Sequence, residues 1–92
     1  SAPLKDKRAE IGKQEMAYAD TASQWLEKAY NTLKAKQGRS KPETISLNRA
    51  VDYLANINYW ERDQTKVNGN SKDYDKYDAL YKKYDAEHNT YQ

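Results

Sequence analysis

Residues that could carry acid–base, metal or nucleophilic chemistry are scarce in this sequence. Its 92 residues include one His and no Cys. A disulfide, a thiolate zinc site and a cysteine nucleophile are therefore excluded. His88 stands beside Asp85 and Glu87, but one carboxylate–imidazole pair is too little for a metal site or a proton relay. We expect His88 to be a half-buried residue in a helix seam, and we expect neither a metal nor a cofactor.

The acidic stretch from Asp63 to Asp73 has the wrong spacing for a calcium-binding EF-hand loop. A loop beginning at Asp63 would place Asn68 at the glycine position and Tyr74 at the position of the bidentate Glu. The sequence also contains no glycine-rich phosphate loop, no Gly-x-Ser-x-Gly and no His-Glu-x-x-His. We therefore predict that the protein is not an enzyme.

Basic residues are densest near the start of the chain. Lys5, Lys7, Arg8 and Lys13 form a cluster that could contact a polyanion. Over the whole chain, 16 Lys and Arg oppose 14 Asp and Glu, which gives a net charge of +2. Proteins that bind nucleic acid usually have a stronger basic stripe and a recognisable module. We therefore do not expect nucleic acid as a partner.

Tyrosine supplies much of the apolar surface of this chain. There are nine Tyr and two Trp, but no Phe. Near the C-terminus, aromatic residues alternate in steps of three and four, a coiled-coil-like pattern: Tyr74, Tyr77, Tyr81, Tyr84, His88 and Tyr91. These rings suit either a bundle core or a recognition surface, because tyrosine joins a large ring to a polar tip. We expect Tyr59, Tyr74 and Tyr91 to contact a protein partner.

Three segments rich in helix-forming residues must position these side chains, at about residues 3–37, 43–67 and 71–91. The short connections between them favour antiparallel neighbours. The sequence therefore predicts a single all-α domain over residues 1–92, a three-helix up-down-up bundle with a long first helix. Residues 1–10 are expected to fray or project. The alternative is a break near Thr21, where Thr21-Ala22-Ser23-Gln24 fits a capping box, and which would give four shorter helices.

Local signals mark the helix ends. Ser40 and Glu43 fit a capping box with Pro42 in the first turn, and Asn70 or Ser71 should cap the third helix. Gly38 should end the first helix. The core should contain the apolar residues that recur at helical spacing: Ile11, Tyr18, Ala22, Trp25, Ala29, Leu33, Leu47, Val51, Leu54, Ile57, Tyr77, Leu80, Tyr81 and Tyr84.

Two short patterns resemble motifs of known families. Tyr74-x-x-x-Asp78 and Tyr81-x-x-x-Asp85 resemble the secretion signal of small helical-hairpin proteins exported by mycobacterial-type secretion systems. The Trp-x-Gly turn of that family is missing, because neither Trp25 nor Trp60 has Gly at the second following position. Separately, residues 23–33 resemble the second helix of three-helix repeats in Gram-positive surface proteins. These motifs do not assign the chain to either family.

These observations favour a non-catalytic helical protein-interaction module. The alternatives are a self-assembling structural subunit, such as a homodimer, and a small secreted protein of the helical-hairpin type. The absence of Cys and the abundance of Lys, Asn and Tyr suit an exported or cell-surface bacterial domain, although a cytoplasmic protein could share this composition. No apolar run approaches the ~18 residues that a membrane span needs.

Overall fold

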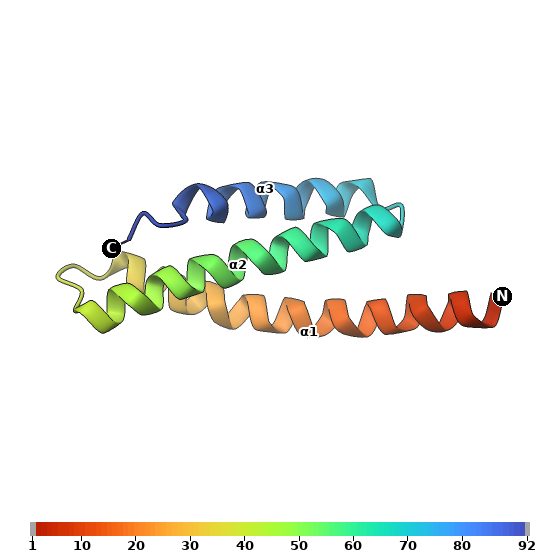
Figure 1. Ribbon diagram of the computed structural model, residues 1–92, viewed down its shortest axis with the longest axis horizontal. Helices are drawn as coiled ribbons and strands as arrows, with labels where there is room; N and C mark the ends of the chain where they lie inside the picture. Colours follow the sequence, from red (N-terminus) through yellow and green to blue (C-terminus); the bar gives the residue numbers. More distant parts are fainter. Residues whose placement is uncertain (1, 92) are drawn as a thin grey trace.

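The computed structural model shows three helices that run up, down and up, joined by two short connections (Figure 1). The structure describes residues 2–91. Helix α1 spans Ala2–Ala35, α2 spans Lys41–Val67 and α3 spans Ser71–Glu87. Helix α2 lies between the other two, and both pack against it. The predicted all-α three-helix bundle is confirmed. The four-helix alternative is wrong, because α1 continues through Thr21 without a break.

Side chains and positive backbone angles set the ends of the helices. The Ser40 side chain accepts a hydrogen bond from the Glu43 backbone N–H, and the Glu43 side chain accepts one from the Ser40 backbone N–H. This is the predicted capping box. Asn70 caps α3 by accepting a bond from the backbone N–H of Asp73. Gly38 has a φ of 65°, a conformation that favours glycine in the turn after a helix.

Helix α3 ends earlier than its tyrosine pattern predicted. It stops at Glu87, and Asn89 then takes a φ of 62°, which turns the chain. The prediction of a half-buried seam position for His88 is wrong, because this residue is the exposed C-cap of α3 and its Nδ1 pairs with Asp52 of α2. Tyr91 folds back over the helix end, where its hydroxyl donates to Glu87 at 3.2 Å.

The core is centred on one face of α2. Leu47, Val51 and Leu54 have no exposed surface. Tyr77 and Tyr84 of α3 are also buried, so these five core predictions are confirmed. The other buried apolar residues and the apolar residues packed partly against this core complete it: Tyr30, Ala50, Ala55, Leu26, Leu33, Leu80, Tyr81 and Tyr91.

The sequence-based prediction chose the wrong face of α1. Five residues assigned to the core are exposed: Ile11, Tyr18, Ala22, Trp25 and Ala29. Apart from Glu27, the buried and half-buried residues of α1 follow steps of four and three: Gly12, Met16, Ala19, Ser23, Leu26, Tyr30 and Leu33. At the N-terminal end of this row, Gly12 lies near the side chain of Gln64 of α2. The apolar residues of α1 therefore occupy more of the helix surface than its contact with α2 covers.

The first part of α1 projects beyond the rest of the molecule. Figure 1 shows its N-terminal end extending past the α2–α3 turn. Residues 3–11 are helical, and each of their side chains is exposed. This projection contributes to the elongated shape of the molecule, 56 × 20 × 16 Å.

Candidate interaction surface

An apolar row with a period of seven residues is exposed along α1. Leu4, Ile11, Tyr18 and Trp25 form this row, which we call the α1 stripe, and their exposed fractions are 58%, 47%, 76% and 69%. A seven-residue repeat keeps side chains on one side of a helix. The four residues of the α1 stripe therefore share one side of the helix, from the projecting end to its middle.

The α1 stripe faces away from α3. The residues of α1 that reach α3 include Asp20, which accepts a bond from Tyr77 at 3.2 Å, Tyr30, which donates to Glu87 at 2.6–2.7 Å, and Lys34, which pairs with Glu87 at 2.8 Å. At about 100° per residue, those residues lie roughly on the opposite face of α1 from the stripe. The stripe is therefore left open to solvent.

A row on α2 leads to its contact with α1. Tyr53 is 57% exposed, and Ile57 and Trp60 are half-buried. The row continues in steps of three and four to Gln64, which lies near Gly12 of α1. At the other end of the stripe, a hollow of about 270 Å³ is formed by Trp25, Lys28, Ala29, Thr32 and Leu33. Trp25 thus lies at the surface, rather than in the predicted core.

Two of the three tyrosines that the sequence proposed as partner contacts lie around Arg62. They are Tyr59 and Tyr74. The Arg62 guanidinium lies 4.4 Å from the ring centre of Tyr59, 5.1 Å from that of Tyr81 and 5.7 Å from that of Tyr74. It also donates to Asp78 at 2.9 Å. Tyr59 is 46% exposed and packs edge-on against Tyr81, while Tyr74 is half-buried. Much of their aromatic surface therefore stabilises the α2–α3 contact.

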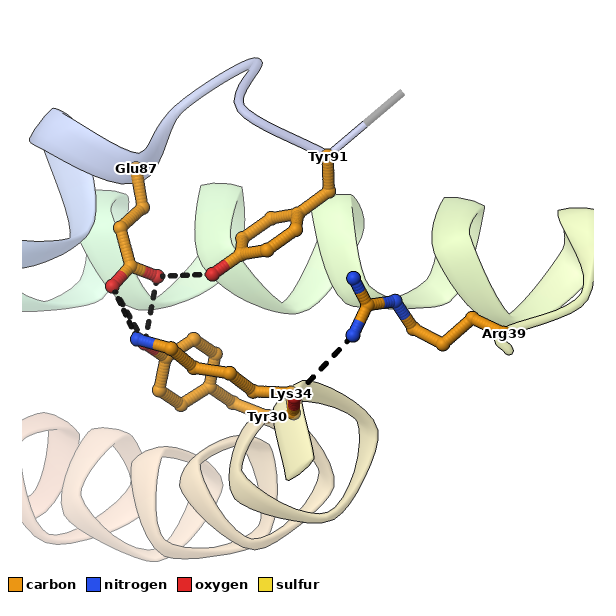
Figure 2. A network of polar contacts seen from close by, with 5 residues as sticks. All are labelled: Tyr30, Lys34, Arg39, Glu87 and Tyr91. Carbon is orange, nitrogen blue, oxygen red and sulfur yellow. Dashed lines mark hydrogen bonds and ion pairs between the residues drawn. The ribbon is translucent and has the colours of Figure 1, made fainter. Parts of the chain in front are cut away.

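The third proposed contact, Tyr91, belongs to a polar network at the end of the bundle where α1 connects to α2 (Figure 2). Lys34 pairs with Glu87 at 2.8 Å, and Glu87 also accepts bonds from the hydroxyls of Tyr30 and Tyr91. The Arg39 guanidinium lies 5.4 Å from the Tyr91 ring centre. Burial works to raise the pKa of Glu87, but the bonds from Lys34 and Tyr30 outweigh it and lower that pKa. The network joins α1 to the chain end.

The predicted basic cluster lies on the projecting part of α1 and just after it. Lys5, Lys7, Arg8 and Lys13 are all exposed. None of the ion pairs found among residues 2–91 involves them. Their charges are therefore directed to solvent along the same segment as the first half of the α1 stripe.

A buried acidic residue was not recognised from the sequence as a titratable site. Glu61 of α2 has no exposed surface, and the Ser23 hydroxyl lies 3.5 Å from its Oε1. Its Oε2 has no hydrogen-bond partner within the described part of the chain. Burial, and then the neighbouring Asp20, raise the pKa of Glu61 to about 8. The Glu61 carboxyl is therefore mainly protonated at neutral pH.

The surroundings of Glu61 are mostly polar. A hollow of about 270 Å³ beside it is lined by hydroxyl, amide, carboxyl and amine groups and one leucine: Asp20, Ser23, Gln24, Glu27, Asn58, Glu61, Lys76, Tyr77 and Leu80. The side chains of residues 2–91 form no group of three His, Cys, Asp or Glu arranged to hold a metal ion. The Glu61 cluster is thus a titratable element inside the bundle.

The function of this chain is inferred from the geometry of its surface. No family model, curated protein or solved structure matches this chain. Within the described residues, no helix combines the length and apolar character needed to cross a membrane. The signal for the α1 stripe was nevertheless in the sequence, as large apolar residues at positions 4, 11, 18 and 25.

Proposed function

We propose that this protein is a non-catalytic interaction module and that the α1 stripe binds an amphipathic helix of a protein partner. The observation that carries this proposal is the exposure of Leu4, Ile11, Tyr18 and Trp25 at intervals of seven residues. A partner helix with the same period can follow such a row over several turns. Solvation alone gives no reason for large apolar residues to recur at this period on an exposed face.

The size of the surface supports binding of moderate strength. A large aromatic side chain can bury roughly 150–250 Å², so the four exposed side chains together present on the order of 400–500 Å². The largest apolar patch on a typical single-chain protein is about 300–600 Å² and is often functional. At about 25 cal/mol per Å², covering it contributes on the order of 10 kcal/mol before the cost of association.

The use of the polar residues supports a non-catalytic role. Glu87, Asp78 and His88 are engaged in contacts that join helices or chain ends. Much of the aromatic surface around Arg62 is likewise used within the fold. The α1 stripe is the large apolar surface that these contacts leave available.

A displayed library of amphipathic helical peptides tests the proposal. We expect selected peptides to bind the whole protein and to lose at least about tenfold in affinity with Trp25→Ala, since central aromatic residues often dominate binding energy. Tyr59→Ala is the matched control, because Tyr59 is an exposed aromatic residue on another face. Peptides that depend on Tyr59 rather than Trp25 would refute the assignment to the stripe. A library that yields no specific binder would refute the interaction module.

A further inference from the structure

We infer that the helix bound by the α1 stripe is α1 of a second copy of this chain, arranged antiparallel. This inference rests on the proposed function and names its partner. It follows from the pattern of residue sizes along α1, the distribution of charge along that helix, and the projection of its N-terminal end.

On the face of α1 that carries the stripe, the large stripe residues alternate with small or charged residues. Four residues after each member of the α1 stripe come Arg8, Glu15, Ala22 and Ala29, all of them exposed. The two sets alternate along α1 in steps of four and three. This is the spacing of the a and d positions that meet in a two-helix coiled coil. In an antiparallel pair, residues of one set face residues of the other set.

One antiparallel register matches every layer of this face. It places Leu4 opposite Ala29 of the partner subunit and Ile11 opposite Ala22 of the partner subunit, so large residues meet small ones. The same register places Trp25 opposite Arg8 of the partner subunit, a cation–π arrangement. Tyr18 then lies opposite Glu15 of the partner subunit, where its hydroxyl can donate to a carboxylate.

A parallel pair in register would bring like charges together. Arg8 would face Arg8 of the partner subunit, and Glu15 would face Glu15 of the partner subunit. Like charges directly across a helix interface oppose association. The antiparallel arrangement removes both conflicts.

The charge along α1 also favours an antiparallel pair. Residues 2–13 contain the four bases Lys5, Lys7, Arg8 and Lys13 against two acids, and residues 14–27 contain three acids and no base. Of the three acids, Glu15 lies on the same face as the α1 stripe, whereas Asp20 accepts a bond from Tyr77 of α3 and Glu27 lines the hollow beside Glu61. The antiparallel register places Glu15 and Arg8 in different layers from their own copies, so like charges do not face each other.

In such a dimer, the projecting end of α1 packs against the partner subunit. Residues 3–11 are exposed on all sides in one chain, and in the pair they lie against the Ala22–Ala29 region of the partner subunit. Both stripes together bury on the order of 1,000 Å², which lies at the low end for specific complexes. We therefore expect a dimer that dissociates in the micromolar range.

Light scattering or sedimentation of the full chain from about 1 µM to about 1 mM tests the dimer. The mass should rise from one chain to two, and Ile11→Lys should weaken association at least about tenfold. Ile45→Lys is the control, because Ile45 is exposed to a similar extent, 42% against 47%, but lies at the start of α2. A monomer throughout, or an equal effect of both substitutions, would overturn the second copy as partner. Peptide selection on Trp25 would still test the proposed function separately.

Engineered cysteines test the orientation, since the chain has no native cysteine. Ile11→Cys and Ala22→Cys variants are mixed and oxidised at a concentration where the dimer forms. The antiparallel register predicts a mixed disulfide between the two variants as the main product. Disulfides within each variant alone would show a parallel pair and overturn the register. Both positions are exposed on α1, and circular dichroism verifies that each variant stays helical.

Discussion

Replacing Glu61 with Gln should stabilise the protein at neutral and alkaline pH. Glu61 has no exposed surface, and its raised pKa of about 8 reflects burial first and the nearby Asp20 second. An amide has a similar shape and carries no charge at any of these pH values. Glu61→Gln therefore removes the cost of placing a carboxylate in this site.

The magnitude follows from the difference in pKa between the folded and unfolded chains. The Glu61 pKa is about 8 when folded, against an ordinary value of 4.5 for a glutamate. The folded state therefore binds more protons between these values, and this contribution to stability is full below the lower pKa and is lost as pH rises through the higher one. At about 1.4 kcal/mol per tenfold change, the Glu61 contribution falls by about 2–3 kcal/mol from pH 5 to pH 7. The fall reaches about 4 kcal/mol by pH 9.

Urea unfolding at pH 5, 7 and 9, followed by circular dichroism, measures this effect. The quantity of interest is the difference in unfolding free energy between Glu61→Gln and the parent, which should grow with pH by the amounts above. Glu10→Gln is the control, because it makes the same change of charge at an exposed position of α1. A difference that stays constant with pH for Glu61→Gln would refute the reasoning, because it would mean that Glu61 titrates as it does in the unfolded chain.

Three further predictions concern the core, a helix cap and the exposed stripe. Leu54→Ala removes a side chain with no exposed surface and should lower the unfolding free energy by about 2–5 kcal/mol; a loss below about 1 kcal/mol in urea would contradict its central place. Ser40→Ala removes the capping bond to the Glu43 backbone and should cost about 1 kcal/mol, which thermal unfolding can measure, and an unchanged midpoint would show that the cap contributes nothing. In dilute protein, Trp60→Phe leaves Trp25 as the only fluorophore of its kind, and its 69% exposure predicts red-shifted emission and strong quenching by acrylamide. Emission from Trp25 that is bluer than that of Trp60 in a Trp25→Phe variant would contradict the exposed α1 stripe.

The sequence determined the number of helices and most of their ends, because those signals are local. The Ser40–Glu43 capping box and the Asn70 cap each involve side chains and backbone groups within three residues. The buried face of α2 was also predictable from local sequence. Leu47, Val51 and Leu54 form its main apolar row, so helical period alone selects the buried side.

The tertiary structure decided how far α3 extends and where its last tyrosine lies. The tyrosine period continues to Tyr91, but the helix ends at Glu87. Tyr91 then contacts Glu87, four residues before it, and Arg39, which follows α1. The contact with Arg39 joins distant parts of the chain, and no local period encodes it.

The face of α1 that meets α2, and the titratable site beneath it, were also decided by tertiary packing. The sequence of α1 offers two adjacent apolar rows, and the row that contains Ser23, Leu26 and Tyr30 is the one that packs inward. That choice buries Ser23 beside Glu61 and leaves Trp25 exposed. A helical pattern fixes which residues share a face, but the shape of the opposing helices decides which face is buried.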